Sequence, residues 1–401
     1  MNVKPEASAF EVESRKRDAH WPGVVSLGLG VFGLVTAEFL PASLLTPISH
    51  DLGISIGAAG QSVTMTAVIG AIAGPAVVIA TSRLDRRLTL WGLTTLLIIS
   101  SFLAAVAGGL ATLLVARAVL GIALGGFWAM SLALAMRLVP EELMPRAMAV
   151  IMTGVSVATV CAAPVGAWVG ETLGWRAAFL IAATVGAIAL AVQVFALPPM
   201  PSMGGAGLGT IAGVLRRPAI RIGLATILLV VSGHFAGFTF IRPFLETVPH
   251  FGVQGISGVL LAFGIGGFLG NFIGGYLAER NTGRAIAFAA TGIAATTLAL
   301  AIVGAHPTIA FIATALWGFA FGALPVSVQS FVTQAASDEA ESAGALMLTT
   351  FQIAISSGAA IGGLIVETQG LEGVFGFAAI AALCGSALIG VLGRSTVRAI
   401  S

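Results

Sequence analysis

The chain has 401 residues, 57% hydrophobic and only 9% charged, with a net charge of +2 and a mean hydropathy of +1.03. Soluble domains carry about 25% charged residues, so the composition excludes a soluble globular protein, and the small net charge gives no sign of a nucleic-acid-binding surface. The apolar runs are continuous over about twenty residues, whereas a lipid-facing β-barrel would alternate over about ten. The sequence therefore predicts an all-α protein that lies in the lipid bilayer.

Twelve apolar segments long enough to cross a bilayer follow a polar N-terminal tail, residues 1–20, which we expect to be disordered. In chain order the predicted spans are 21–46, 57–81, 89–110, 111–137, 147–170, 176–197, 220–245, 255–278, 284–304, 308–334, 342–365 and 371–393. The first span is too long for a cleaved signal peptide and leads into no soluble domain. A short C-terminal tail, residues 394–401, follows the last span.

The basic residues predict the orientation of the spans. Sixteen of the nineteen Lys and Arg residues lie in the two tails or in connections that follow an even-numbered span, and only Arg117, Arg176 and Arg242 lie elsewhere. With twelve spans, all sixteen are on the same side of the membrane. Because positive charge marks the cytoplasmic side, we predict that both termini are cytoplasmic.

The predicted spans divide into two similar groups of six. The longest connection, residues 198–219, is rich in Pro and Gly and is predicted to be a cytoplasmic linker. The sequence EFLP (Glu38 to Pro41) in the first span corresponds to FIRP (Phe240 to Pro243) in the seventh. We therefore predict two pseudo-symmetric six-helix bundles, residues 21–197 and 220–393, which face one another across a central cavity.

Glu38 is the only carboxylate that lies deep within a predicted span. A carboxylate in hydrocarbon is costly, so it indicates a functional site that carries a proton or binds a polar solute. Arg117 in the fourth span lies at a similar depth, roughly 21 Å from the cytoplasmic side. We predict that the two side chains approach one another and that a motion separating them lets Glu38 take up a proton. The alternative is a static ion pair that orients the helices.

Further polar and aromatic side chains could line a substrate site with Glu38 and Arg117. His234, halfway along the seventh span, could titrate near its ordinary pKa of about 6.5 or bind a hydroxyl or base; the alternative is a hydrogen-bonded interhelical histidine. Amides pair with hydroxyls or nucleobases, and indole rings stack on planar ligands, although both also join helices. The candidates of these two kinds are Trp128, Asn271, Trp317, Gln329 and Gln352.

Cys161 and Cys384 lie in apolar segments and are expected to pack, not to form a disulfide or a metal site.

Several stretches resemble the motifs of a known family. AEFLPASLLTPISHDLGISIGAAGQSVT (Ala37 to Thr64) is similar to a first-span signature, and RAVLGIALGGFWAMSLALAMRLVP (Arg117 to Pro140) to a fourth-span motif. GGYLAERNTGR (Gly274 to Arg284) resembles a loop motif of Gly, an acid and a base. On these motifs the chain resembles the major facilitator superfamily, and within it the bacterial proton-driven exporters of drugs and metabolites.

This resemblance implies a proton antiporter of a bacterial inner membrane that works by alternating access and exports a small polar metabolite. With GHFAGFTFIRP (Gly233 to Pro243) included, the motifs are most similar to those of exporters of purine ribonucleosides. Efflux of arabinose-type sugars or of drugs is the alternative. Two motifs depart from the family pattern: the loop after the second span lacks its usual Gly, and Ala163 stands where the antiporter motif places Gly.

Charged residues near the ends of spans are predicted to act as gates. Arg242, near the outer end of the seventh span, is predicted to be a periplasmic gate residue. Loop charges after the second and eighth spans could latch one conformation through ion pairs to a neighbouring helix end; the alternative is that they only set the topology. The resemblance favours the latch for the charges after the eighth span. These residues are Asp85, Arg86, Arg87, Glu279, Arg280 and Arg284.

Other classes of membrane protein are disfavoured by the sequence. The spans contain no HExxH, paired acids, Gly-x-Ser-x-Gly or P-loop, which argues against an enzyme and against direct ATP drive. A channel would need neither a two-copy plan nor a buried acid. We therefore expect a monomeric carrier without cofactor or metal, whose partners are a small-molecule substrate and protons. Six Trp and one Tyr favour a polar solute over a drug.

Overall fold

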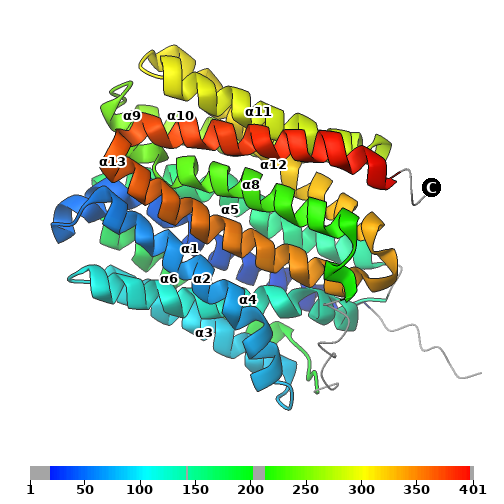
Figure 1. Cartoon of the computed structure of the whole chain (residues 1–401). Helices are drawn as coiled ribbons and strands as arrows, with labels where there is room; N and C mark the ends of the chain where they lie inside the picture. Colours follow the sequence, from blue (N-terminus) through cyan, green and yellow to red (C-terminus); the bar gives the residue numbers. More distant parts are fainter. Residues whose placement is uncertain (1–18, 141–142, 202–212, 398–401) are drawn as a thin grey trace, which may run out of the picture.

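The computed structural model describes residues 19–140, 143–201 and 213–397, which form helices and short connections with no strand (Figure 1). The N-half comprises α1 (Trp21–Leu52), α2 (Ile56–Ala80), α3 (Arg86–Ala105), α4 (Leu110–Leu138), α5 (Met144–Thr172) and α6 (Trp175–Ala196). The C-half comprises α8 (Pro218–Thr239), α9 (Ile241–Thr247), α10 (Val253–Arg280), α11 (Thr282–Val303), α12 (Pro307–Ala335), the 3-10 turn η2 (Ser337–Glu339) and α13 (Ala340–Val397). The predicted all-α class is confirmed.

Eleven of the described helices are long and apolar enough to cross a membrane. The last, α13, contains an apolar stretch of 51 residues that is interrupted at Gly370, where φ is 80° and ψ is −178°. Figure 1 shows the orange and red parts of α13 folding back on one another at this point. A positive φ favours glycine, which lacks a Cβ. The two parts of α13 correspond to the predicted spans 342–365 and 371–393, so eleven helices accommodate the twelve predicted segments.

Three predicted spans differ from the observed helices. The third was expected to end at 110, but α3 ends at Ala105, shortly before the poor helix formers Gly108 and Gly109. The first was expected to end at 46, but α1 continues to Leu52 and ends at Gly53, which is left-handed (φ 61°) and donates its N–H to carbonyls of the last turn. The seventh, predicted as continuous over 220–245, breaks at Phe240 into α8 and α9. Pro243 has no N–H to give to the carbonyl four residues earlier, and its ring clashes with that carbonyl.

The buried apolar residues form two clusters, one drawn mainly from the N-half and one mainly from the C-half. The halves meet where α2 packs on the first part of α13 and where α5 packs on α10. Large apolar side chains are exposed on the outside of the bundle, among them Phe195 (90% exposed) and Ile302 (72%). So much exposed apolar surface is unfavourable in water, so this outer surface is suited to the hydrocarbon of a bilayer.

The connections between α2 and α3, α4 and α5, and α10 and α11 lie at one end of the bundle. Because Arg83, Arg137 and Arg280 lie at or beside these connections, we call it the arginine-rich end, and the other the opposite end. The described residues leave out 1–18 of the predicted N-terminal tail, 202–212 of the predicted linker and 398–401 of the predicted C-terminal tail. Helix α13 continues to Val397 and so extends into the predicted C-terminal tail.

Small residues let neighbouring helices approach closely in each half. A Cβ on Gly121 of α4 would lie 2.6 Å from the carbonyl oxygen of Thr66 in α2, and one on Gly274 of α10 would lie 2.5 Å from that of Ala323 in α12. Such spacing leaves no room for a larger side chain, so these helices pack backbone against backbone.

Candidate functional site

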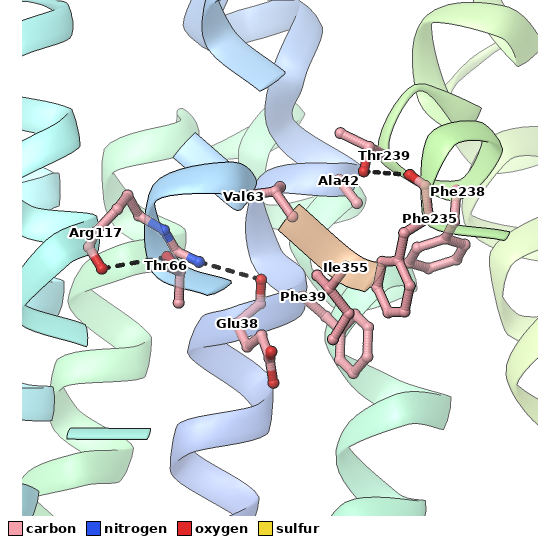
Figure 2. A pocket seen from close by; sticks show the side chains of 10 residues that line it. All are labelled: Glu38, Phe39, Ala42, Val63, Thr66, Arg117, Phe235, Phe238, Thr239 and Ile355. Carbon is pink, nitrogen blue, oxygen red and sulfur yellow. Dashed lines mark hydrogen bonds between the residues drawn. The ribbon is translucent and has the colours of Figure 1, made fainter. Parts of the chain in front are cut away.

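A cavity lies between the two halves near the middle of α1 (Figure 2). Its two charged residues come from the N-half, and two of its three phenylalanines come from the C-half. The lining residues are Glu38, Phe39, Ala42, Val63, Thr66, Arg117, Phe235, Phe238, Thr239 and Ile355. The cavity volume is about 10 Å³, which is room for about one water molecule. This conformation is therefore closed around its centre, and a larger solute would enter only after side chains move.

Arg117 is buried (1% exposed) and is held entirely by backbone oxygens. Its guanidinium donates to the carbonyls of Ala37 (2.7 Å) and Glu38 (3.2 Å) in α1 and of Ser62 (3.2 Å) in α2. The Thr66 hydroxyl in turn donates to the Arg117 carbonyl at 3.2 Å. This single side chain therefore joins α4 to α1 and α2 at the level of the cavity.

Pro41 explains why Arg117 finds an acceptor on α1. A proline has no N–H, so the carbonyl four residues earlier, that of Ala37, lacks its helical partner. Pro41 lies inside α1, and the shortest of the three guanidinium bonds goes to that same carbonyl. The arginine supplies the missing hydrogen bond, which allows α1 to continue past the proline.

Glu38 and Arg117 are brought together, but not as a side-chain ion pair. Arg117 bonds the Glu38 carbonyl, and among the described residues no group forms a hydrogen bond or ion pair with the Glu38 carboxylate. Figure 2 shows the carboxylate pointing away from the guanidinium. The two residues therefore lie side by side, whereas the predicted approach of their charged groups is not present in this conformation.

The C-half contributes an aromatic wall from α8. Phe235 and Phe238 face the cavity, and His234 lies behind them, 4.9 Å from Phe235 edge to face and 5.6 Å from Phe238 in a stacked arrangement. Trp317 packs edge-on against His234 at 5.2 Å between ring centroids. His234 Nδ1 and Trp317 Nε1 are buried and have no hydrogen-bond partner among the described residues. Two predicted candidates thus lie in one cluster, one layer behind the cavity.

The remaining candidates for substrate binding are dispersed. Gln352 is buried one turn before Ile355, which lines the cavity, and its Oε1 has no partner among the described residues. Trp128 is partly buried in α4, and Gln329 is exposed on α12. Asn271 lies in a separate groove with Tyr276 and Glu279 on α10, away from the cavity. The structure therefore groups only Gln352 of this set with the cavity.

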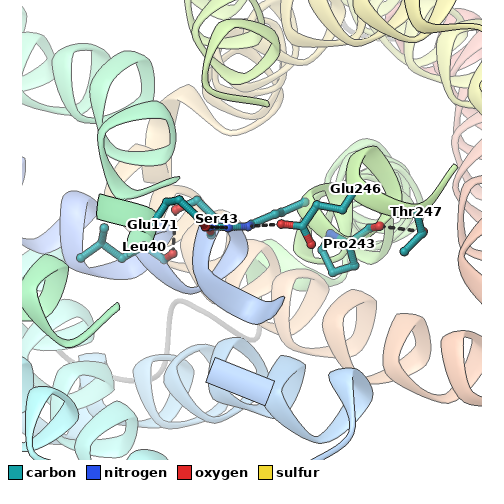
Figure 3. Close-up of polar contacts among 7 residues, drawn as sticks. Leu40, Ser43, Glu171, Pro243, Glu246 and Thr247 are labelled. Carbon is teal, nitrogen blue, oxygen red and sulfur yellow. Dashed lines mark hydrogen bonds and ion pairs between the residues drawn. The ribbon is translucent and has the colours of Figure 1, made fainter. Parts of the chain in front are cut away.

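A second buried arginine, Arg242 of α9, lies at the opposite end (2% exposed). Its guanidinium donates to the Ser43 carbonyl of α1 at 2.6 Å and pairs with Glu246 at 2.7 Å and with Glu171 of α5 at 3.5 Å. Figure 3 shows Ser43 and Glu171 on one side of this network and Glu246 on the other. Because Ser43 and Glu171 belong to the N-half, Arg242 ties the two halves together.

Proline again supplies the acceptor. Pro47, the second proline inside α1, leaves the Ser43 carbonyl without its helical N–H. Arg242 donates to that carbonyl. Both buried arginines therefore satisfy carbonyls that prolines free on the same helix.

A second contact closes the halves at the same end. The Ser55 hydroxyl, at the N-cap of α2, donates to a carboxylate oxygen of Glu367 in α13 at 2.6 Å. Close by, a Cβ on Gly57 would lie 2.9 Å from the carbonyl oxygen of Gly363. Opening a path from the cavity to the opposite end requires these contacts and the Arg242 network to separate.

The loop charges lie at the arginine-rich end and interact locally. Asp85 caps α3 and accepts the N–H of Met200 (3.1 Å), which holds the start of the inter-half connection; Arg87 pairs with Asp85 at 3.4 Å. Arg86 donates to Thr81. On α10, Arg280 bonds Tyr276 of its own helix and Glu279 is exposed. Asn281 caps α11 by accepting the N–H of Arg284. No ion pair joins them to a neighbouring helix in the part of the chain described.

The sequence reasoning missed the aromatic lining and the acidic partners of Arg242. Phe235 and Phe238 look like ordinary apolar-span residues, and their one signal is their spacing of three, which puts them on one helical face. Glu171 lies at the end of a span and resembles a solvated charge. Glu246 could have been found, because it stands four residues after Arg242, the spacing of a helical ion pair.

The chain is similar to known proteins over nearly its whole length. The family model of the Major Facilitator Superfamily matches residues 27–359 and 263–399. The purine ribonucleoside efflux pump NepI of Escherichia coli O157:H7 is 39% identical over 368 residues, which is 91% of this chain and 93% of that protein. The protein of the same name from Shigella dysenteriae serotype 1 gives the same identity and coverage.

Solved structures share the fold. A bacterial homolog of the human lysosomal transporter Spinster, in an inward-facing and occupied conformation, superposes with a TM-score of 0.77 at 15% identity, covering 94% of this chain and 97% of that one. The inward-facing and unoccupied structure gives 0.72 at 15% identity, covering 96% and 97%. At this identity the likeness concerns the fold alone.

Proposed function

The chain belongs to the Major Facilitator Superfamily and is a secondary efflux transporter, and we propose that it exports purine ribonucleosides in exchange for protons. The observation that carries the proposal is the cavity between the halves, in which Glu38 is the only acidic lining residue and has no partner among the described residues. The 39% identity to the ribonucleoside pump supports the substrate.

Exchange follows from the chemistry of one carboxylate. When ionised, Glu38 can accept hydrogen bonds from ribose hydroxyls; when protonated, it offers fewer acceptor sites. A proton and a nucleoside therefore compete for the same group, which is the requirement for antiport. Thr66, beside it in the cavity, is a further hydroxyl donor and acceptor.

Arg242 is the proposed gate at the opposite end. The arginine-rich end is taken as cytoplasmic because basic residues favour that side, so the opposite end faces the periplasm of a bacterial inner membrane. In this conformation the Arg242 network and the Ser55–Glu367 bond support closure toward the periplasm. Release of substrate to that side requires them to break, and proton uptake by Glu38 would follow once the cavity opens there.

The test is uptake of labelled inosine into inverted membrane vesicles with an acid interior, comparing the native protein with Glu38→Gln. We expect uptake that an uncoupler abolishes and that falls at least about tenfold in the variant. Glu339→Gln is a matched control, because this carboxylate lies in η2 at the arginine-rich end. Native vesicles that take up no inosine would overturn the nucleoside assignment, and labelled arabinose is then the next substrate to test. Equal uptake by Glu38→Gln would remove Glu38 from proton coupling.

A further inference from the structure

Phe39 is the only aromatic residue that the N-half contributes to the cavity lining. Its ring lies against the aromatic wall of the other half, nearly parallel to Phe235 (12°, centroids 6.2 Å apart) and edge-on to Phe238 (89°, 5.9 Å). Figure 2 shows Phe39 beside Glu38, on the side of the cavity that faces α8. A planar ring from one half thus occupies a two-sided aromatic niche in the other.

The niche is supported from behind, so it would keep its shape without Phe39. Phe238 stacks on Phe263 at 4.9 Å, and His234 stacks on Phe321 with its ring parallel within 1°. His234 and Trp317, which close the back, are 1% and 0% exposed. Their ring nitrogens, Nδ1 of His234 and Nε1 of Trp317, are buried and have no hydrogen-bond partner among the described residues.

We propose that Phe39 holds the place of the purine base in the empty carrier and that the base displaces it. This inference rests on the proposed function, because it assigns the orientation of a nucleoside in the same cavity. Rings at these separations attract one another in parallel and edge-to-face geometry, so a purine that replaces Phe39 gains both contacts. The ribose then lies toward Glu38 and Thr66, the polar side of the cavity.

The small cavity volume is consistent with this exchange. The cavity of about 10 Å³ holds no solute larger than water while Phe39 stays in the niche. A free sugar has no planar ring with which to replace the phenyl group, so the niche discriminates in favour of nucleosides. Because Phe39 and Glu38 are adjacent on α1, displacement of the ring shifts the helix segment that carries the proposed proton site.

Two substitutions of Phe39 are expected to act in opposite directions. Phe39→Ala removes the competing ring and should lower the inosine concentration for half-maximal uptake by about threefold or more, while Phe39→Trp, a larger competitor, should raise it. Phe235→Leu removes a wall of the niche and should also raise it. In a Phe235→Leu background, the effect of Phe39→Ala should shrink.

The measurement is inosine uptake by inverted vesicles, normalised to the amount of transporter, with unlabelled ribose as a competitor. Phe32→Ala is the matched control, because Phe32 lies on the same helix and does not line the cavity; it should leave the half-maximal concentration unchanged. If Phe39→Ala raises that concentration, or if Phe39→Ala and Phe39→Trp both leave it unchanged, the niche proposal is overturned while native inosine transport upholds the proposed function. Absence of inosine uptake by the native protein overturns both.

Discussion

Arg117 and Arg242 perform the same chemistry at two heights of α1 with different consequences. Each is a buried guanidinium that donates to a carbonyl left free by a proline in that helix. Arg117 comes from the same half as α1, so its bonds hold one bundle together. Arg242 comes from the other half, so its bonds last only while the halves are closed. Under the proposed mechanism, the bonds of Arg117 persist while those of Arg242 break in each transport cycle.

The surroundings of the two arginines follow this division. Arg117 is bound by carbonyl oxygens alone, whose number does not change when the halves rock. Arg242 has two carboxylates, Glu246 on its own helix and Glu171 across the interface. When the halves part, Glu246 can keep the cation paired while Ser43 and Glu171 are released. A buried charge would otherwise be left without a partner at considerable cost.

The largest expected effect is that of Arg117→Leu. It leaves the carbonyl of Ala37 without a donor, whereas that of Ser62 keeps the hydroxyl of Thr66. A buried unsatisfied group costs about 1–3 kcal/mol. We expect the free energy of unfolding to fall by about 2 kcal/mol or more, measured by thermal unfolding of the purified protein in detergent. Arg117→Lys keeps the charge but not the planar fork, so its free energy of unfolding should lie between those of Arg117→Leu and the native protein. A variant as stable as the native protein would contradict a structural role.

Arg242→Gln should loosen the contact between the halves with less effect on unfolding. Loss of charged hydrogen bonds worth about 1.5–3 kcal/mol corresponds to roughly a tenfold or greater shift toward the conformation open at the opposite end. Spin labels at positions 50 and 250, with Cys161 and Cys384 replaced by Ala, would report the distance between the halves. Arg176→Gln is the control, because Arg176 pairs at that end with Asp51 of its own half. Identical distance distributions for Arg242→Gln and the native protein would exclude the gate.

The two prolines provide the most direct test of the comparison. Pro47→Ala restores a backbone N–H that can donate to the Ser43 carbonyl and so compete with Arg242. The distances between the same spin labels should therefore become longer. One hydrogen bond, about 0.5–1.5 kcal/mol, predicts a change of roughly two- to tenfold. Pro41→Ala competes only with Arg117 and should leave that distance unchanged. Equal shifts in the two variants would contradict the assignment of separate roles.

The smallest effect is expected at an exposed ion pair of the arginine-rich end. Arg217 bonds both carboxylate oxygens of Asp338 at 2.6 Å, and this hydrogen bonding lowers the pKa of Asp338 from 3.8 to about 2. A lowered carboxylate pKa stabilises the fold above pH 3.8, and that contribution is lost as the pH falls toward 2. Asp338→Asn should therefore lower the melting temperature slightly at pH 5, and the difference should shrink below pH 3.8.

High salt should reduce the Asp338→Asn difference as well, because solvent and ions screen an exposed pair. The same salt should leave the Arg117→Leu effect unchanged, since that site is buried. A salt-independent Asp338 effect would contradict the assignment of this pair as solvated. Comparing the salt dependence of the two variants shows how burial changes the contribution of an arginine contact to the stability of this protein.

Much of the architecture was determined by the sequence alone. Hydrophobic runs of bilayer length dictate helices, because an unpaired backbone is too costly in hydrocarbon. The predicted spans match the observed helices except at the ends of α1 and α3 and at the break before α9. Glu38 was recognisable because a lone acid in an apolar span is rare. Both prolines of α1 could be read in the sequence, but not the donors that would satisfy their free carbonyls.

The tertiary structure alone decided which side chains meet. Arg117 and Glu38 were expected to pair through side chains, yet the guanidinium binds backbone oxygens, because Pro41 leaves an acceptor nearer than the carboxylate. The aromatic niche and the Arg242 network join residues nearly two hundred positions apart, as from Ser43 to Arg242. Periodicity and composition describe each helix by itself; the packing of the two halves decides which faces meet, and so places a charged wall opposite an aromatic one.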